Sequence, residues 1–225
     1  MSEQLAIHGG KRSVPESFVK PWPYVTTADQ QAVMEVFKSD GIIEQQRIQS
    51  EGLAKEWAEY MGVKYCIPVN SGTAALHMCL TGVGIEPGDE VIVPAFTFWA
   101  SAAAVLHHNA IPVFLDIDPE TYCIDSDLIE AKISERTKAI MPVHIHGMPA
   151  DMDAVLEIAK KHNLKVIEDV AQAHGARYKE RLCGSMGDAA GYSTQASKTL
   201  SSGCQGGLFT TNDEMVYERA SLLQY

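Results

Sequence analysis

Lys198 is the residue whose type and surroundings most favour covalent chemistry. It lies among serines, threonines and glycines in segment 192–207, directly after the apolar run 189–192. A lysine amine forms an imine with a carbonyl compound, most readily when burial keeps the amine partly neutral. Its short neighbours, Ser193 among them, let a ligand approach the backbone closely. The alternative is a solvated lysine in a glycine-rich loop, which is the usual environment of this residue type.

Asp169 ends the apolar segment 165–169. A carboxylate in that position is costly to bury unless a positively charged group meets it. A protonated pyridine nitrogen is such a partner, and a carboxylate that holds this proton keeps a pyridoxal cofactor an electron sink. Gln172 follows three residues later, so a tight turn brings its amide to the same ligand. The alternatives are a helix cap for Asp169 and a core position for His174; we favour the core position for His174 but not the cap for Asp169.

Residues 71–73, Ser-Gly-Thr, follow the apolar segment 65–69 and open a helical pattern. The free N–H groups, the hydroxyls and the positive end of a helix together suit a phosphate group. The alternative is a plain N-cap by Ser71 or Thr73. The sequence contains neither GxGxxG nor GxxxxGK[ST], so a nicotinamide-dependent oxidoreductase and a P-loop enzyme lack their main sequence feature.

Three aromatic residues, Phe96, Phe98 and Trp99, follow the apolar segment 90–94 at a strand-to-helix junction. One aromatic side chain at such a junction can lie flat on a heteroaromatic ring, in the offset geometry that such pairs favour. Packing in the core is the alternative for each of them, and we expect Phe96 and Trp99 to be core residues.

The elements that must position these residues alternate in type. Apolar strands are predicted at 65–69, 90–94, 111–115, 139–143 and 165–168, and helices at 73–81, 99–107, 126–133 and 152–162. Apolar strands joined by crossover helices form a largely parallel α/β sheet with helices on both sides. Ligands of such sheets bind beyond the carboxyl ends of the strands, where the candidate residues lie. An irregular arm of residues 1–27 and helices at 27–40 and 50–61 precede the sheet.

The bulk properties are those of an ordinary globular protein. The chain has 225 residues, 46% of them hydrophobic, which is enough for one large α/β domain. Its net charge of −11 argues against nucleic acid or an anionic membrane as the main partner. The five cysteines form no CxxC pair, so we predict neither disulfides nor a metal site and favour a reducing compartment. Because no signal sequence or membrane-spanning run is evident, we expect a soluble cytoplasmic protein.

Taken together, these segments resemble the sugar aminotransferases of the DegT/DnrJ/EryC1/StrS family, which are pyridoxal 5'-phosphate (PLP) enzymes of the fold-type-I aspartate aminotransferase superfamily. The resemblance begins near Pro23 and runs to the last residue in the family's order. The matching segments are 71–76 (SGTAAL), 88–94 (GDEVIVP), 97–98 (TF), 116–118 (DID), 144–147 (HIHG), 149–153 (PADMD), 168–175 (EDVAQAHG), 187–188 (GD), 193–198 (STQASK), 206–207 (GG) and 211–213 (TND). No single segment is decisive, whereas the ordered set is specific.

The resemblance implies a role for each candidate residue. Lys198 forms the Schiff base with PLP and later moves the proton between the cofactor and the amine-bearing carbon of the substrate. Asp169 pairs with the pyridine nitrogen, and Gln172 lies near the phenolic oxygen. Phe98 takes the position of the aromatic residue that stacks on the ring. The residues that bind the phosphate are Gly72, Thr73 and Ser193.

The reaction that the resemblance implies is transamination. Glutamate or glutamine converts PLP to the pyridoxamine form, and a nucleotide-linked keto sugar or a keto-cyclitol then takes up the amine. The implied fold is a fold-type-I large domain, with a mixed but mostly parallel sheet between helices. The implied assembly is a homodimer with shared active sites. Residues 1–27 are then an arm, residues 28–225 are the PLP-binding large domain, and the family's small C-terminal domain is absent from the chain.

Two departures from the family pattern keep alternatives open. The family's Gly-Glu-Gly-Gly is replaced by segment 203–207, Gly-Cys-Gln-Gly-Gly, which has an extra residue and no glutamate. The chain also ends within a helical pattern that starts near Asp213. Both features suit a non-catalytic, degenerate paralogue that acts as a scaffold. A PLP-dependent dehydratase or aminoaromatic synthase of the same family is another alternative, although its sugar dehydratases carry histidine at the lysine position.

Overall fold

A seven-stranded sheet forms the centre of the computed structural model, which describes residues 4–18, 20, 22–38 and 41–224. In spatial order the strands are β1 (Tyr65–Val69), β9 (Gly207–Thr211), β8 (Ala189–Ser193), β5 (Lys165–Asp169), β4 (Thr137–Ile140), β2 (Glu90–Pro94) and β3 (Ile111–Leu115). Strand β9 runs antiparallel to both of its neighbours, and the other neighbouring pairs are parallel. The mixed, mostly parallel sheet predicted from the sequence is therefore confirmed.

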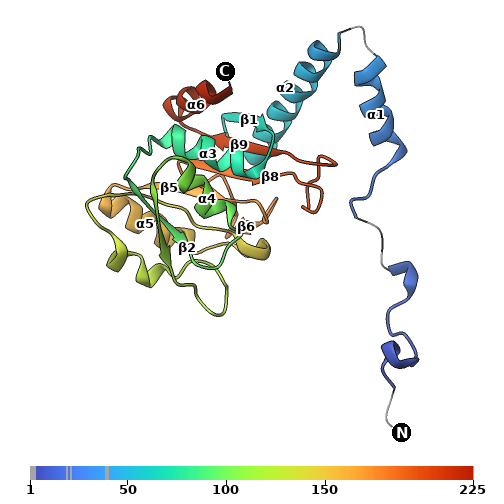
Figure 1. Cartoon of the computed structure of the whole chain (residues 1–225), viewed down its shortest axis with the longest axis horizontal. Helices are drawn as coiled ribbons and strands as arrows, with labels where there is room; N and C mark the ends of the chain where they lie inside the picture. Colours follow the sequence, from blue (N-terminus) through green and yellow to red (C-terminus); the bar gives the residue numbers. More distant parts are fainter. Residues whose placement is uncertain (1–3, 19, 21, 39–40, 225) are drawn as a thin grey trace.

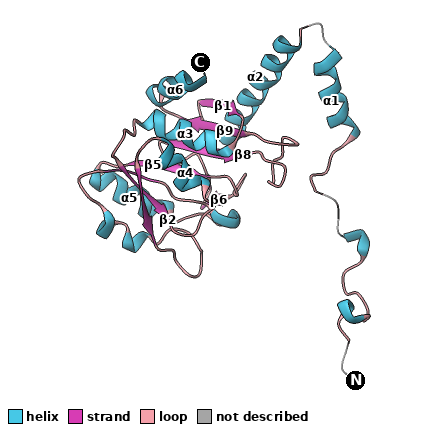
Figure 2. Cartoon of the chain, viewed as in Figure 1, coloured by secondary structure: helices cyan, strands magenta, loops and turns pink. Residues whose placement is uncertain are grey.

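Helices cover both faces of this sheet (Figure 2). Helices α3 (Gly72–Val83), α4 (Ala100–His107) and α6 (Glu214–Ser221) cover one face, and α2 (Ile42–Met61) and α5 (Met152–His162) cover the other. The alternation of side chains along each strand separates the two layers: Val91 and Val93 pack with α3 and α4, whereas Ile92 packs with α5. Burial on both faces explains why the central strands read as continuous apolar runs.

Local sequence signals set the ends of the helices beside the sheet. Ser71 is the N-cap of α3, and Gly84 ends that helix in the left-handed region with a φ of 84°. Asp151 caps α5 through a bond from the Ala154 N–H, and Asn163 ends it with a φ of 55°. These are the residue types that favour helix starts and stops, which is why both helices were predictable from the sequence.

Several elements differ from the prediction. Segment 126–133 forms two 3-10 turns, η3 (Ser126–Leu128) and η4 (Glu130–Lys132), instead of an α-helix. Ile129 is its only buried residue, so the segment lacks the repeated apolar contacts that stabilise an amphipathic helix. Strand β4 starts and ends earlier than the predicted 139–143, and α2 starts at Ile42 rather than near residue 50.

The prediction also missed strands β8 and β9 and a small hairpin. The hairpin strands are β6 (Arg177–Tyr178) and β7 (Arg181–Leu182). Four further short helices complete the described chain: η1 (Ala6–His8), η2 (Glu16–Phe18), η5 (Ile145–Gly147) and η6 (Leu222–Gln224).

The N-terminal arm and helix α1 (Thr27–Lys38) extend away from the body of the molecule (Figure 1). None of the residues of α1 is buried. Helix α2 continues from this region into the body, where Trp57 and Met61 pack on the sheet. Among the described residues, no helix combines the length and the apolar character needed to cross a membrane.

Candidate active site

The carboxyl ends of several strands meet at one edge of the sheet. Strands β2, β4, β5 and β8 run parallel to one another, and β1 shares their direction because β9 is antiparallel to both β1 and β8. In register, Val69 at the end of β1 pairs with Gly207, which pairs with Ser193 at the end of β8. The segments that follow β1, β2, β5 and β8 therefore start at the same edge, and each carries a predicted site residue.

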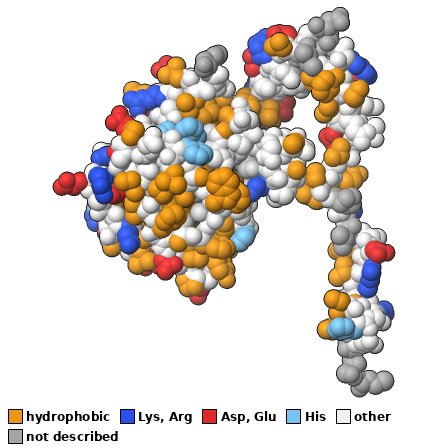
Figure 3. All heavy atoms as spheres, viewed as in Figure 1, with side chains coloured by type: hydrophobic (Ala, Val, Ile, Leu, Met, Phe, Trp, Pro, Cys, Tyr) orange, Lys and Arg blue, Asp and Glu red, His pale blue; other side chains and the backbone are white. Residues whose placement is uncertain are grey.

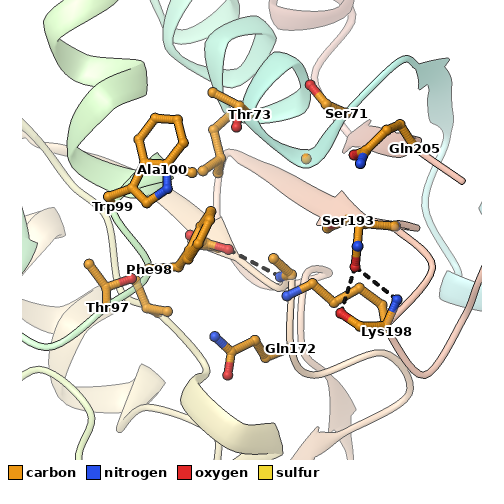
Figure 4. Close-up of a pocket in the computed structure, with 17 residues that line it drawn as sticks. Ser71, Thr73, Thr97, Phe98, Trp99, Ala100, Gln172, Ser193, Lys198 and Gln205 are labelled. Atoms are coloured by element: carbon orange, nitrogen blue, oxygen red, sulfur yellow. Dashed lines mark hydrogen bonds between the residues drawn. The ribbon is translucent and has the colours of Figure 1, made fainter.

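A cavity of about 400 Å³ lies at this edge, and all seven predicted site residues line it. They are Gly72, Thr73, Phe98, Asp169, Gln172, Ser193 and Lys198. Lys198 extends its side chain into the cavity toward Phe98 and Gln172 (Figure 4). Ser71, Thr73 and Gln205 stand on the side formed by the start of α3 (Figure 4). The structure thus brings together residues that are more than a hundred positions apart in the sequence.

The start of α3 forms one wall of the cavity. The Ser71 Oγ accepts a hydrogen bond from the Ala74 N–H at 3.1 Å, while the first N–H groups of a helix point out of its end. Gly72 contacts β8 so closely that an added Cβ would lie 2.7 Å from the Ser193 Cβ. Only a residue without a side chain allows this approach. The N-cap considered as the alternative is therefore present, in a turn whose N–H groups and hydroxyls suit an anion.

Asp169 is 4% exposed and faces the cavity from the end of β5. Its Oδ2 accepts a hydrogen bond from the Ser101 hydroxyl at 2.7 Å, and its Oδ1 accepts one from the Ala171 N–H at 3.1 Å. Burial raises the pKa of Asp169 above its ordinary value, and these two bonds and the charge of Lys198 oppose the increase. A cationic group bound in the cavity would offset the cost of burying this carboxylate.

Gln172 is held by a neighbouring turn with unusual backbone geometry. Its Oε1 accepts a hydrogen bond from the His146 N–H at 3.0 Å. His146 has a φ of 53°, in the left-handed region that is costly for a residue with a side chain. This bond fixes the Gln172 amide at the cavity wall, in the tight turn predicted after β5.

The segment that carries Lys198 is held by a local network. The Lys198 N–H donates to the Gln195 carbonyl oxygen at 2.8 Å. The Ser197 N–H and hydroxyl both donate to the Gln195 Oε1, at 2.8 and 2.5 Å. Lys198 is half-buried and lines the cavity, where the solvated lysine considered as the alternative would lie on the open surface.

His174 links the segment after β5 to the segment of Lys198. Its Nδ1 lies 3.1 Å from the Thr199 Oγ1, whereas its Nε2 is buried without a hydrogen-bond partner among the described residues. The ring packs near Trp57 and Tyr192, with centroid distances of 6.2 and 6.0 Å. Burial lowers the pKa of His174 to about 4. His174 is half-buried rather than fully buried, so the predicted core position is met only in part, and one ring nitrogen has no hydrogen-bond partner among the described residues.

The aromatic residues after β2 lie at the surface. Phe98 lines the cavity and is 56% exposed. Phe96 and Trp99 are 44% and 64% exposed, so the prediction that they are core residues was wrong. All three occupy the connection between β2 and α4, beyond the end of the strand and outside the packed layers.

Some residues of the site were missed by the sequence-based prediction. Ser101, which bonds to Asp169, is fully buried in the first turn of α4. The available signal was a serine within the otherwise apolar segment 100–106. Gln205 and Trp99 also line the cavity. Gln205 belongs to segment 203–207, which the sequence marks only as a departure from the family pattern.

The residues of the cavity fit PLP. The amine of Lys198 suits an aldehyde, and the buried carboxylate of Asp169 suits a protonated pyridine nitrogen. The close approach of Gly72 to Ser193 builds a cradle of N–H and hydroxyl groups that suits a phosphate. Phe98 supplies an aromatic face at the cavity wall. The aldehyde, the ring nitrogen, the phosphate and the face of the ring each have a matching group at the cavity.

Comparison with known proteins gives relatives along most of the chain. The profile of the DegT/DnrJ/EryC1/StrS aminotransferase family matches residues 23–225. The chain is 49% identical over 170 residues to GDP-perosamine synthase of Caulobacter vibrioides, a match that covers 76% of this chain and 46% of that protein. It is 42% identical over 218 residues to L-glutamine:2-deoxy-scyllo-inosose aminotransferase of Streptomyces lividus, which covers 95% of this chain and 51% of that protein. The chain spans about half the length of the curated relatives it matches.

A solved structure agrees with these relatives. NtdA from Bacillus subtilis, solved with its cofactor PMP bound, matches 87% of this chain and 45% of its own with a TM-score of 0.76 and 31% identity. PMP is the pyridoxamine form of PLP, so PLP is the cofactor that this likeness and the cavity both indicate. The fold-type-I aminotransferase fold predicted from the sequence is confirmed. This chain belongs to the DegT/DnrJ/EryC1/StrS aminotransferase family.

Proposed function

We propose that this protein is a PLP-dependent transaminase that moves an amino group from glutamate or glutamine to a nucleotide-linked keto sugar or a keto-cyclitol. The observation that carries the proposal is the convergence of Lys198 and Asp169 on one cavity from the ends of β8 and β5. These are the two groups that an aromatic aldehyde and its ring nitrogen require. Membership of an aminotransferase family supports this reaction over other uses of a cavity lysine.

Each residue then has a defined task. Bound PLP supplies an electron sink for the electron pair left behind when the substrate loses a proton. Lys198 forms the covalent link to the cofactor, and its amine takes and returns that proton. Asp169 holds the proton on the ring nitrogen, Gln172 binds the phenolic oxygen and Phe98 stacks on the ring. The phosphate ligands are Gly72, Thr73 and Ser193.

The names of the relatives support the proposed donor and both proposed acceptor classes. One relative is named for GDP-perosamine, a nucleotide-linked amino sugar. The other is named for glutamine as its donor and for an inosose, which is a keto-cyclitol. In both acceptor classes the group that receives the nitrogen is a ketone on a polyhydroxylated ring. The same transamination reaction therefore applies to a keto sugar and to a keto-cyclitol.

We further propose a homodimer with shared active sites. Apolar side chains gather over the face where α4 lies (Figure 3), and Trp99, Leu106 and Phe114 are 64%, 57% and 53% exposed. Trp99 also lines the cavity, so a second chain that covered this face would close the site as well. Light scattering after size exclusion tests this proposal: a monomer at micromolar concentration would contradict it.

Two further parts of the proposal concern location and organisation. A cytoplasmic location is supported by the five cysteines, all of which are free. In the proposed domain organisation, residues 1–27 form an arm and residues 28–225 form the PLP-binding large domain.

Absorption spectroscopy tests the proposed function. The chain is incubated with PLP, and the visible band of the Schiff base is recorded for the wild type, for Lys198→Ala and for Lys138→Ala, an exposed lysine that serves as the control. L-glutamate or L-glutamine is then added, and conversion to the pyridoxamine form is followed. We expect the band in the wild type and the control only, and its loss on addition of a donor.

The two ways in which this test can fail separate the alternatives. Absence of the band in the wild type would contradict PLP binding at Lys198. A Lys198-dependent band that neither donor converts would contradict transamination and favour the scaffold alternative, to which the altered segment 203–207 points.

A further inference from the structure

A chain of hydroxyl groups leads from the cavity wall to Asp169, and the proposed reaction assigns it no task. The Thr97 Oγ1 lies 2.8 Å from the Ser101 Oγ, which lies 2.7 Å from the Asp169 Oδ2. Ser101 is 0% exposed, and Thr97 lines the cavity. A buried hydroxyl is costly unless it is hydrogen-bonded, and alanine at position 101 would avoid that cost. The serine therefore calls for an explanation beyond packing.

The negative charge of an ionised Asp169 fixes the direction of these hydrogen bonds. An ionised carboxylate can only accept, so the Ser101 hydroxyl donates to Asp169. Two other acceptors lie within reach of that hydroxyl, the Thr97 Oγ1 at 2.8 Å and the Phe98 carbonyl oxygen at 3.3 Å, and both are neutral. The shorter, charge-assisted bond is the stronger one. Because the single hydroxyl hydrogen of Ser101 is donated to Asp169, the Ser101 oxygen accepts a hydrogen bond from the Thr97 hydroxyl. Both hydroxyl dipoles then point toward the carboxylate.

Besides the hydroxyl chain, one backbone N–H group and three titratable side chains act on the Asp169 carboxylate. The Ala171 N–H holds the Oδ1, which leaves the Oδ2 to Ser101. The titratable groups that act on Asp169 are Lys198, His144 and Cys79, from the segments after β8 and β4 and from α3. Ser101 donates to Asp169 from α4, on the layer opposite Glu168.

We propose that Thr97 and Ser101 form a relay that keeps Asp169 ionised and aims its carboxylate at the ring nitrogen of the cofactor. Both are positioning residues, because they act on the cofactor through Asp169. The inference rests on the proposed function, since an ionised carboxylate is needed here to hold a protonated pyridine ring. Without the relay, burial would favour the protonated carboxyl group, which cannot hold that proton.

The direct test follows the Asp169 carboxyl carbon by 13C NMR as a function of pH, in the chain without cofactor. The resonance is assigned by its loss in Asp169→Asn. In Ser101→Ala we expect the midpoint of the titration to move to higher pH by about one pH unit, because a hydrogen bond to the charged form is lost. Thr97→Val, which keeps the shape of threonine, should move it by less, and Thr97→Ser should leave it unchanged.

A double variant distinguishes a relay from two independent effects. If Thr97 acts through Ser101, Ser101→Ala combined with Thr97→Val should titrate like Ser101→Ala alone. In the PLP-loaded protein, the same variants should slow the half-reaction with the amino donor while the KM for that donor changes little. Circular dichroism shows whether each variant folds. If Ser101→Ala does not fold, the test is the comparison of the Asp169 titration midpoint between Thr97→Val and Thr97→Ser.

An unchanged Asp169 titration in Ser101→Ala, or in Thr97→Val where that variant is the decisive one, would overturn the relay. So would additive shifts in the double variant. Failure of the proposed function gives a different result, the absence of a Lys198-dependent absorption band. The titration of Asp169 requires no cofactor, so the relay is tested whichever result the band gives.

Discussion

Glu168 and Asp169 are consecutive residues of β5, and their carboxylates face opposite sides of the sheet. Asp169 bonds to Ser101 of α4 and faces the cavity. Glu168 accepts a hydrogen bond at 3.0 Å from the Nε2 of His144, on the side covered by α5. Successive side chains of a β-strand point to opposite faces of the sheet, which is why these two neighbouring carboxylates lie on different sides. One strand end thus supplies a carboxylate for the proposed reaction and another that organises the loops on the opposite side of the sheet.

The surroundings of Glu168 explain its ionised state. The His144 Nδ1 accepts from the Ala150 N–H at 3.1 Å, which leaves the N–H at Nε2 to donate to Glu168. The carboxylate also accepts bonds of 2.7 Å from three N–H groups, those of Gly184, Met186 and Gly187. Burial alone would raise the pKa of Glu168, but these bonds hold it below its ordinary value.

Replacement of Glu168 by glutamine should therefore destabilise the fold. The amide NH2 would face hydrogen-bond donors in a fully buried site, and we expect a loss of about 3 kcal/mol in the free energy of unfolding at pH 7. Urea denaturation measures this loss. Glu157→Gln, an exposed position on α5, is the matched control and should change stability by less than about 0.5 kcal/mol. Equal stabilities of the two variants would show that the Glu168 network is dispensable.

The parts of the fold that were predictable from the sequence are those whose signals are local. Ser71 and Asp151 cap their helices within four residues, and the apolar runs mark the central strands wherever both faces are covered. The shared edge then follows from topology, because parallel strands place their carboxyl ends together. That rule places the residues after β1, β2 and β5 together, whereas Lys198 was assigned to the same site through the family resemblance, because strand β8 before it was not predicted.

The parts that were not predictable depend on distant contacts. Ser101 has its role because Asp169, 68 positions away in the sequence, lies beside it. Strand β9 is defined by antiparallel pairing with both β1 and β8, which no local pattern specifies. Phe96 and Trp99 were assigned to the core because large aromatic residues are usually buried there, whereas their loop lies beyond the sheet.

Asp169→Asn should separate cofactor binding from turnover. The amide has nearly the same shape but removes the negative charge that holds a proton on the ring nitrogen. We expect PLP to remain bound and the half-reaction with the amino donor to slow by about 100-fold or more. Stopped-flow absorbance measures the half-reaction, with the exposed Asp127→Asn as control. Comparable rates in Asp169→Asn and the wild type would show that Asp169 is misassigned.

His174 should make the stability of the fold depend on pH in a defined window. Burial lowers its pKa from 6.5 to about 4, so the unfolded chain binds a proton between these values and the folded chain does not. Stability should therefore be highest above pH 6.5 and should fall as the pH decreases toward 4, by about 2–3 kcal/mol from this residue. His174→Gln should remove this part of the decrease, and thermal melting between pH 8 and pH 4 measures it. Parallel curves for the variant and the wild type would contradict the assignment.

Gly72→Ala should weaken both the fold and the proposed phosphate site. The new methyl group would lie 2.7 Å from the Ser193 Cβ and 3.1 Å from its Cα, so the turn and β8 must move apart. We expect a loss of about 1–3 kcal/mol in stability. Gly52→Ala in α2 is the matched control, because nothing lies within 4 Å of its new methyl group and alanine favours a helix interior by about 0.5–1 kcal/mol.

The same pair of variants tests where the phosphate binds. If the turn at Gly72 holds the phosphate, Gly72→Ala should weaken the binding of PLP by a larger factor than that of pyridoxal, which lacks the phosphate. Equilibrium titration followed by absorbance gives both affinities, and Gly52→Ala should change neither. An equal loss for the two ligands would mean that the methyl group disturbs the cavity as a whole, and the phosphate would have to be assigned to another wall. A selective loss for PLP would place it between the start of α3 and the end of β8.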